Sequence, residues 1–219
     1  MPSSGRRPDD PDRGTRRLAR ADRRAQIIEA AAGAFLQGGF EGTSMEDVAS
    51  NAGISRLLLY RHFDNKRHLY RAVLSSVTDE LAERFQDRNM AEIRRQGGIV
   101  RIMLGIARRH ADAFRLLWRQ AAQEPDFAEF ARNFRRVLGR YAEAMIAASG
   151  RLTDPTMMRW CSTTLAAHLM DGLCTWLDDG EPSRDDTYVV LQVCGLFAMV
   201  DAWGEPHPPE WVLGPATAP

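Results

Sequence analysis

Apolar residues recur every three or four positions along most of this chain, a spacing that places them on one face of an α-helix. Ile27, Ala31, Ala34 and Phe35 form the first such stripe. The stripe predicts a helix over about residues 22–37, ended by the two glycines that follow it. No segment between residues 21 and 204 alternates apolar and polar side chains as a half-buried strand does. The chain is therefore predicted to be all-α.

The same spacing, together with residues that favour helix ends, predicts about nine helices in all. A short helix begins at the segment TSMEDVA, and the next begins at Ser55. A long helix begins near Lys66, with Asp64 or Asn65 as its capping residue. Asp154 is a suitable first residue for a later helix, because aspartate accepts hydrogen bonds from backbone N–H groups there. The later helices are expected near residues 99–109, 111–123, 126–149, 155–178 and 184–203.

Composition divides the chain into four parts. Residues 1–20 combine Pro, Gly and charge with few apolar side chains, which predicts a disordered basic arm. Residues 21–68 hold the first three predicted helices, and residues 69–204 hold a larger helical bundle. Residues 205–219 form a Pro-rich tail that is also predicted to be disordered.

The 29 basic and 29 acidic side chains cancel, but they are unevenly distributed. Residues 1–24 carry eight Arg against four Asp, and residues 55–71 carry five basic side chains against Asp64 alone. The remainder of the chain is net acidic. This asymmetry predicts that a surface near the N-terminus faces an anionic partner.

Three cysteines, Cys161, Cys174 and Cys194, are too few and too widely spaced for a disulfide framework or a zinc site. They are predicted to be small buried apolar residues, and no cofactor is expected. The first residues are rich in Arg, Asp and Pro rather than apolar, so no secretion signal is expected. The longest charge-free apolar stretch, residues 187–200, is too short to span a bilayer. A reducing, cytoplasmic location without a membrane partner is therefore expected.

Two of the N-terminal helices stand at the spacing of a helix-turn-helix. Ala49 is small enough for two helices to approach closely, and Gly53 can supply the positive φ that a three-residue turn needs. Leu59 then falls on the inner face of the second helix. The first of these helices has two alternative capping-box pairs, Thr43 with Glu46 and Ser44 with Asp47.

The segment IIEAAAGAFLQGGFEGTSMEDVASNAGISRLLLYRHFDNKRHLYRAVL closely resembles the N-terminal DNA-binding domain of TetR (tetracycline-repressor-type) regulators. The resemblance rests on the aliphatic stripe of the first helix and on the positions Gly39-Phe40, Val48-Ala49, Ala52-Gly53-Ile54-Ser55, Leu59-Tyr60, Phe63, Lys66 and Leu69. Beyond residue 74 the chain is similar to the family mainly in its number of helices. In that family the second part binds a ligand, and its last two long helices form the four-helix bundle of a dimer.

The resemblance implies that duplex DNA covers the outer face of the helix that begins at Ser55. Ser55 and this helix N-terminus can approach phosphates, because N–H groups and the helix dipole favour an anion. Arg56 and Arg61 can reach phosphates or guanine edges in the major groove. By analogy with the family, Thr43, Tyr60 and Lys66 contact phosphates. The full set of predicted DNA contacts is Thr43, Ser44, Ser55, Arg56, Leu57, Leu58, Tyr60, Arg61, His62 and Lys66.

Leu57 and Leu58 depart from the family pattern, which usually has small or hydroxylated residues at these positions. Leucine cannot hydrogen-bond a base, so both can touch only apolar edges such as the thymine methyl, or pack on neighbouring residues. For Leu58 the two alternatives stay open. Base hydrogen bonds are expected to be few and to involve Arg56, Arg61 and His62.

Residues 69–204 are rich in Met and aromatic side chains at helical spacing, which fits a core and also suits a pocket for a small apolar effector. The candidate pocket residues are His110, Phe114, Trp118, Phe134, Trp160 and His168. His168 and Asp171 lie three positions apart, so they can orient a ligand or pair with each other at a dimer interface.

The last predicted helix is apolar on more than one face, so a partner is expected to bury it. This predicts a homodimer, whose two-fold symmetry requires a pseudo-palindromic DNA operator. The candidate interface residues are Asp171, Leu173, Val190, Cys194 and Phe197. The implied function is a ligand-responsive transcriptional repressor.

Three other functions are alternatives: an enzyme, a redox sensor and a weakly specific DNA-binding protein. An enzyme is disfavoured, because no nucleophile–base pair, phosphate-cradling loop or metal-ligand spacing is present in the sequence. A redox sensor would use the three cysteines, and a weakly specific DNA-binding protein would fit Leu57 and Leu58. The basic arm can follow the minor groove or serve as a flexible solubilising tail.

Overall fold

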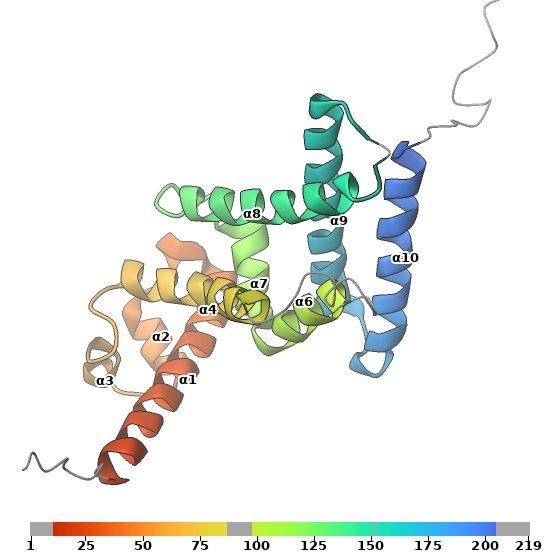
Figure 1. The fold of residues 1–219 in the computed structure, drawn as a ribbon. Helices are drawn as coiled ribbons and strands as arrows, with labels where there is room; N and C mark the ends of the chain where they lie inside the picture. The colour runs from red at the N-terminus through yellow and green to blue at the C-terminus, as the bar shows by residue number, and fades with distance from the viewer. Residues whose placement is uncertain (1–10, 87–97, 151, 205–219) are drawn as a thin grey trace, which may run out of the picture. The chain divides into compact units, whose positions relative to one another are not determined.

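The computed structural model describes residues 11–86, 98–150 and 152–204, which contain nine α-helices and no strand (Figure 1). The prediction of an all-α chain is confirmed. In order, the helices are α1 Pro11–Gly42, α2 Met45–Asn51, α3 Arg56–Tyr60, α4 Lys66–Gln86, α6 Gly98–Arg109, α7 Ala111–Arg115, α8 Ala128–Ala147, α9 Pro155–Asp179 and α10 Asp185–Gly204. A π-helical turn, Leu116–Gln120, follows α7, and a 3₁₀ turn, Pro182–Arg184, precedes α10.

The chain divides into two compact units, residues 1–76 and 77–219, so the division falls inside α4. The sequence predicts the division earlier, between residues 68 and 69. The difference arises because the first half of α4 supplies apolar side chains to the core of the N-terminal unit. The Tyr70 ring packs edge-on against Phe35 and Phe40, with ring centroids 4.9 Å and 5.1 Å away. Leu69 and Val73 of the same helix are fully buried.

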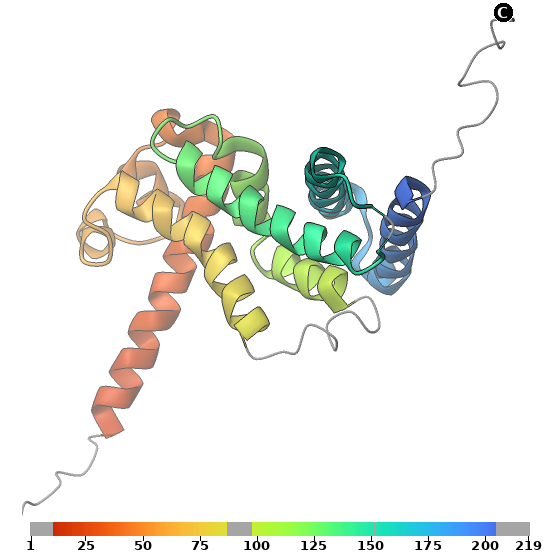
Figure 2. The same ribbon diagram turned by 45° about the horizontal axis from the view of Figure 1, so that its top comes forward.

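Helix α1 begins earlier than predicted, because residues 11–20 are also helical (Figure 2). The expectation of disorder is therefore corrected for these ten positions. Arg, Leu and Ala favour helix, and Pro11 stands in the first turn, where its missing N–H leaves no helical hydrogen bond unmade. Residues 1–10 and the predicted tail, residues 205–219, lie outside the described residues.

Side chains cap several helices at the predicted positions. Of the two possible pairs at α2, the structure has Ser44 and Asp47: Ser44 Oγ accepts the Asp47 N–H at 3.1 Å, and Asp47 Oδ2 accepts the Ser44 N–H at 2.8 Å. The Ser44 hydroxyl and N–H together lower the pKa of Asp47. Asn65 caps α4 and Asp154 caps α9, each by accepting backbone N–H groups of the first turn.

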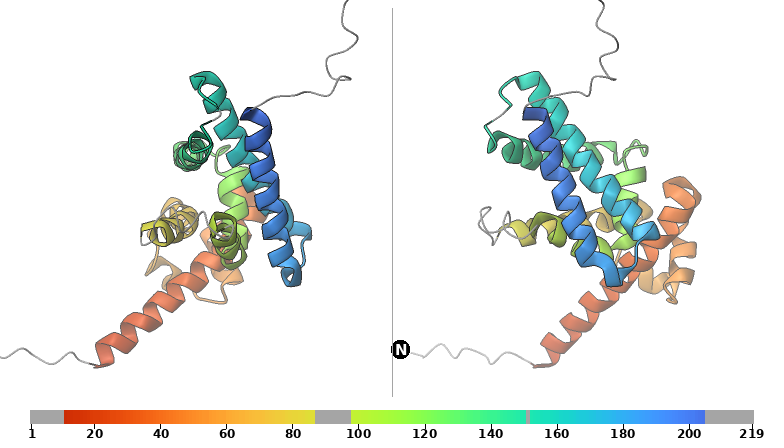
Figure 3. Two further views of the ribbon diagram at one scale, coloured as in Figure 1. Left: turned by 45° about the vertical axis from the view of Figure 1, so that its right-hand side comes forward. Right: turned by 90° about the vertical axis from the view of Figure 1, so that its right-hand side faces the viewer.

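In the second unit α8 packs on α9, and α9 lies beside α10 (Figure 3). The start of α10 is tied to α6 and α9 through the carboxylate of Asp185. Asp185 accepts two hydrogen bonds from Arg108, at 2.7 Å and 3.2 Å, and one from the indole N–H of Trp176 at 2.7 Å. The single helix predicted over residues 111–123 is instead α7 followed by the π-helical turn, in which the backbone bonds reach one residue further.

Candidate nucleic-acid interface and apolar cavity

Helices α2 and α3 are joined by the tight turn that Ala49 and Gly53 predict. Gly53 has a φ of 63°, in the region that only glycine adopts readily. Its N–H donates to the carbonyl of Ser50, and the N–H of Ile54 donates to the carbonyl of Ala49, both at 3.0 Å. Ala49 itself is buried. The turn and the small residue together fix how the two helices pack.

The three leucines of α3 have three different environments. Leu59 is fully buried, Leu58 is half-buried, and Leu57 is 75% exposed. Tyr60 and Arg61, which follow Leu57 by three and four positions, are exposed as well. Leu57 therefore lies on the solvent face of α3. The side chain of Leu58 packs partly on neighbouring residues and is partly accessible to solvent.

Arg56 at the start of α3 is held by two neighbours. Its Nη1 lies 2.6 Å from Oε1 of Glu46 in α2, and its Cζ lies 5.4 Å from the ring centroid of Tyr60. A hydrogen bond with Tyr60 and the charge of Glu46 raise the pKa of Arg56. Because both partners of the ion pair are exposed, the pair is weak, and a stronger anion can replace Glu46. Glu46 was not among the predicted site residues, because its contact comes from the other helix.

Ser55 begins α3, and its Oγ accepts the backbone N–H of Leu58 at 3.2 Å. Lys66 begins α4. Its Nζ lies 3.3 Å from the carbonyl oxygen of Glu41 and 4.5 Å from the centroid of the Phe40 ring. These contacts hold the ammonium group in place but leave it without a carboxylate partner among them, so it can still bind an anion.

Thr43 lies in a different environment from the other predicted contacts. It is 4% exposed, and its hydroxyl lies 2.8 Å from the carbonyl oxygen of Gly39 and 3.1 Å from that of Ala34. The hydroxyl therefore donates within the protein, at the point where α1 turns. The expectation that this hydroxyl reaches a phosphate is corrected, because in this structure it is hydrogen-bonded to the backbone near the end of α1.

Arg61 and His62 directly follow α3, with Arg61 exposed and His62 half-buried. Burial lowers the pKa of His62, and the charges of surrounding arginines lower it further. These arginines are Arg61 itself and three residues of α1: Arg20, Arg23 and Arg24. The α1 arginines were not predicted as site residues, although their helical spacing from the buried Ile27 could have indicated which way they face.

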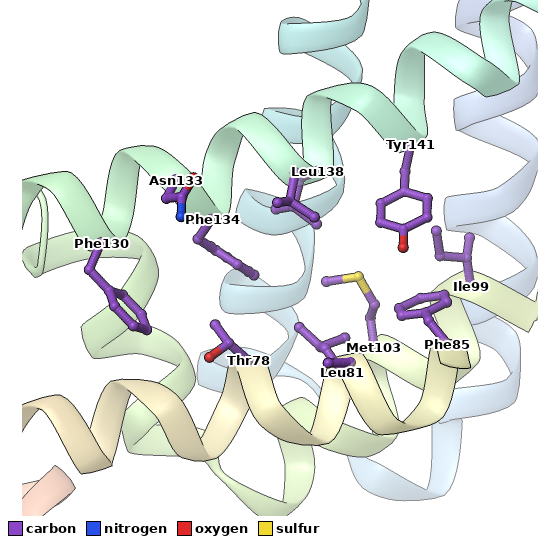
Figure 4. A pocket seen from close by; sticks show the side chains of 12 residues that line it. Thr78, Leu81, Phe85, Ile99, Met103, Phe130, Asn133, Phe134, Leu138 and Tyr141 are labelled. Atoms are coloured by element: carbon purple, nitrogen blue, oxygen red, sulfur yellow. The ribbon is translucent and has the colours of Figure 1, made fainter. Parts of the chain in front are cut away.

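A cavity of about 290 Å³ lies in the second unit between the second half of α4, α6 and α8 (Figure 4). None of the described residues that line it is charged. Its polar groups come from Thr78, Asn133 and Tyr141, and the hydroxyl of Tyr141 points toward α4 (Figure 4). The rings of Tyr141 and Phe85 stack at one end, with centroids 5.3 Å apart. The volume and lining suit a small apolar ligand with one or two hydrogen-bonding groups.

Of the six residues predicted to line a pocket, Phe134 lines this cavity. Trp118 lines a second cavity, of about 390 Å³, together with Arg119 and Arg135.

Phe114 is fully buried in the core. Trp160 is 57% exposed and His168 is exposed. His110 Nε2 lies 2.9 Å from Oε2 of Glu80. Helical spacing shows which residues share a face but not which element that face meets.

The predicted dimer residues also divide into two groups. Val190 and Phe197 are 58% and 56% exposed on α10, and Cys194 is exposed on the same helix. Leu173, in contrast, is fully buried within its own chain, so it cannot form an interface, and this expectation is corrected. Asp171 accepts a hydrogen bond from the indole N–H of Trp118 at 2.5 Å.

Among the described residues, one helical segment, Pro182–Gly204, is long and apolar enough to cross a membrane by length and composition. The sequence expectation considered only the charge-free residues 187–200. A helix that a second protein copy covers passes the same test, so the segment is weak evidence for a membrane span.

Cys161 and Cys174 are buried, whereas Cys194 is exposed, so the expectation that all three cysteines are buried is corrected for Cys194. Burial raises the pKa of Cys161, and it raises the pKa of Cys174 to about 11. Both are therefore thiols near neutral pH, whereas oxidation proceeds through the thiolate. No group of three or more His, Cys, Asp or Glu in the described part of the chain could hold a metal ion.

Residues 27–73 match the family model described as bacterial regulatory proteins, tetR family. The HTH-type transcriptional activator FasR of Mycolicibacterium smegmatis is 40% identical over 76 residues. The N-terminal part of the chain is therefore similar to the TetR family, whose model describes bacterial regulatory proteins. The match with FasR covers 35% of this chain and 35% of FasR, so the chain matches about a third of the length of that relative.

Solved structures resemble the chain over most of its length. A TetR-like transcriptional regulator from Rhodococcus sp. RHA1 has a TM-score of 0.64 and 19% identity, covering 82% of this chain and 94% of that one. AibR in complex with isovaleryl coenzyme A and operator DNA has a TM-score of 0.58 and 20% identity, covering 80% of this chain and 98% of that one. At such identities the similarity shows a shared fold, including the helical second unit.

Proposed function

We propose that this protein is a TetR-family, sequence-specific, ligand-responsive transcriptional regulator that binds a pseudo-palindromic operator as a homodimer. The solvent face of α3 carries the proposal. Leu57, Tyr60 and Arg61 are exposed on it, while Leu59 anchors the opposite side in the core. An apolar side chain between cationic ones suits a major groove, where thymine methyl groups lie close to guanine edges and phosphates.

Contacts around this face position it on the duplex. Arg56 can exchange its exposed Glu46 partner for a phosphate or a guanine edge. Ser55, at the start of α3, lies where backbone N–H groups favour an anion. At the start of α2 the Asp47 carboxylate accepts the Ser44 N–H, so a phosphate contact at Ser44 would have to replace Asp47. Lys66 contributes from α4 as a third element. Phosphate contacts from three helices would fix the register of α3, and the bases facing Leu57 and Arg61 would then set specificity.

The dimer is supported by the surface of α10. Three apolar side chains of this helix are more than half exposed: Val190, Leu191 and Phe197. Exposing such an apolar surface to water is unfavourable for a monomer. A second copy that covers this face would generate two-fold symmetry. The two copies of α3 would then read half-sites about 34–36 Å apart, one turn of the duplex.

The effector is proposed to be a small neutral compound bound in the cavity between α4, α6 and α8. The protein is proposed to act in the cytoplasm, to repress when free, and to release its operator when the effector binds. Loss of transcript on deletion of its gene would instead make it an activator, the class in which FasR is named. A redox sensor would have to use Cys194, the exposed cysteine, because burial raises the pKa of Cys161 and Cys174.

Footprinting on the DNA that flanks its own gene, followed by fluorescence anisotropy, tests the DNA-binding part. We expect the protected duplex to bind about a thousandfold more tightly than a shuffled duplex of the same composition. Two protomers should bind each duplex. Arg61→Ala should weaken binding, and Arg132→Ala, an equal loss of charge on an exposed residue of α8, should not.

Equal affinity for the protected and shuffled duplexes would favour the weakly specific alternative. Binding of a single protomer to each duplex would contradict the homodimer. If Arg61→Ala and Arg132→Ala had the same effect, binding would reflect total charge rather than the face of α3.

A further inference from the structure

One face of α1 changes from apolar to basic as the helix leaves the core. Ile27, Ile28 and Ala31 are buried. Residues three, four and seven positions apart share a side of a helix, so Arg20 and Arg24 continue this face toward the N-terminus. Both are exposed. The side of α1 that packs on the helix-turn-helix therefore continues, one turn earlier, as arginine.

These arginines lie at the C-terminal end of the reading helix α3. The Cζ of Arg24 is 5.0 Å from the ring centroid of Phe63, which is fully buried two residues after Arg61. The charges of Arg20 and Arg24 also reach His62, as their effect on its pKa indicates. The α1 arginines and the arginine that follows α3 thus form one basic surface within the N-terminal unit.

The N-terminal part of α1 extends past α2 and α3 (Figures 1 and 2). Arg20 and Arg24 lie four positions apart and share one side of this helix, while Asp22 falls on the opposite side. The sequence has three further arginines, at positions 13, 16 and 17, and neighbouring arginines of this series are mostly three or four positions apart. Like charges three and four positions apart destabilise a helix, so this row favours a partner that supplies negative charge along a line.

We propose that this face of α1, centred on Arg20 and Arg24, binds the sugar-phosphate backbone of the duplex just outside the half-site read by α3. The proposal rests on the proposed function and adds a contact surface to it. From position 13 to position 24 the helix rises about 17 Å. This length matches roughly five base pairs of duplex.

The chemistry favours phosphates over bases as the ligand. Guanidinium groups bind phosphate oxygens bidentately, and a row of phosphates presents negative charge at regular intervals along a strand. Such contacts add affinity without reading sequence. The operator should therefore include about five flanking base pairs on each side whose presence matters and whose identity does not.

Two duplexes test the proposal: one ends at the two half-sites, and the other extends them on both sides with random sequence. We expect wild-type protein to bind the extended duplex more tightly and with a steeper salt dependence between about 50 and 200 mM salt. The double substitution Arg20→Gln with Arg24→Gln should reduce that salt slope by about 2 for each protomer bound, on the extended duplex alone. Arg20→Lys with Arg24→Lys keeps the charge and should retain most of the slope.

The matched control is Arg132→Gln with Arg140→Gln, which removes two exposed arginines from α8. It should bind both duplexes as the wild type does. Unchanged affinity of the glutamine variant for the short duplex shows that its helix-turn-helix is folded. An unchanged slope on the extended duplex overturns the proposal, and so does an equal loss on both duplexes, which would place the contacts inside the half-site. If wild-type protein bound neither duplex specifically, the proposed function itself would fail.

Discussion

At the scale of single residues, the end of α1 depends on the close approach of Gly38 and Thr43. A Cβ atom at Gly38 would lie 2.7 Å from the Thr43 hydroxyl oxygen, which is held against the carbonyls of Ala34 and Gly39. We expect Gly38→Ala to displace this hydroxyl and to lower the free energy of unfolding by about 1–3 kcal/mol. Urea denaturation followed by circular dichroism measures the change.

Gly42→Ala is the matched control, because a Cβ atom at Gly42 meets nothing within 4 Å. This variant should be as stable as the wild type or slightly more so, since alanine favours helix over glycine. Equal stability of the Gly38 and Gly42 variants would mean that Thr43 can move aside without cost, contrary to its two close carbonyl partners.

The sequence predicts the residues of α3 better than the residues around it. Capping by Ser55, burial of Leu59 and exposure of Arg61 all follow from helical register, which is a local property. The burial of Thr43 does not follow, because its partners lie across a turn whose path depends on Gly39, with a φ of 69° and a ψ of 175°. A hydroxyl residue just before a helix looks the same in sequence whether it faces solvent or the core.

At the scale of elements, Asp185 joins three helices through Arg108 and Trp176. Burial alone would raise the pKa of Asp185, but the hydrogen bonds from these two residues outweigh it, so the pKa is lowered from 3.8. We expect Asp185→Asn to lower the free energy of unfolding at pH 7 by about 1–3 kcal/mol, because charge-assisted hydrogen bonds are lost. Asp186→Asn is the control, since its pair with Arg101 is exposed and worth little.

The effect of Asp185 should also depend on pH. A carboxyl group whose pKa is lower in the folded state stabilises the fold above its unfolded pKa, and this contribution is lost as the pH falls through the folded pKa. The difference between wild type and Asp185→Asn should therefore be constant near neutral pH and shrink below about pH 4. A difference that stayed the same in acid would mean that packing, not charge, accounts for the loss.

Most helices could be predicted from the sequence, because amphipathic spacing and capping residues act within a few positions of each other. The neighbours of those helices could not. Leu173 and Val190 are both apolar residues in long helices, yet one is buried in its own chain and the other is more than half exposed. The choice depends on which helices pack together, and that in turn depends on residues far away in the sequence.

At the scale of the whole molecule, α4 belongs to both units. Tyr70 and Val73 contribute to the N-terminal core, while Leu81 and Phe85 line the cavity. A ligand in the cavity would contact the second half of a helix whose first half packs in the core of the proposed DNA-binding unit, so α4 would connect the proposed effector to that unit. The effector can shift DNA affinity only if it binds the DNA-free state more tightly than the DNA-bound state.

The cavity also limits which compounds can act. Because no described lining residue is charged, an anionic compound would be buried without a partner, at a high cost in free energy. In a thermal-shift screen we expect neutral apolar compounds to raise the melting temperature and their carboxylate analogues to have little effect. Tyr141→Phe, which removes one hydrogen-bonding group from the cavity, should weaken compound binding and leave operator affinity unchanged.

Coupling between the two sites has a quantitative consequence. If a compound lowers operator affinity by some factor, typically about 5- to 150-fold, then the operator must lower the affinity for that compound by the same factor. Anisotropy of a labelled operator with and without compound gives the first factor, and calorimetry with and without operator gives the second. Equal factors that both fall toward one when bulky side chains fill the cavity, as in Leu81→Trp, would assign the coupling to this cavity. Unequal factors would mean that the measurements are not at equilibrium, for example because the compound aggregates the protein. Equal factors that do not change when the cavity is filled would mean that the compound acts elsewhere, for example by direct competition at α3, and the role proposed for α4 would have to be abandoned.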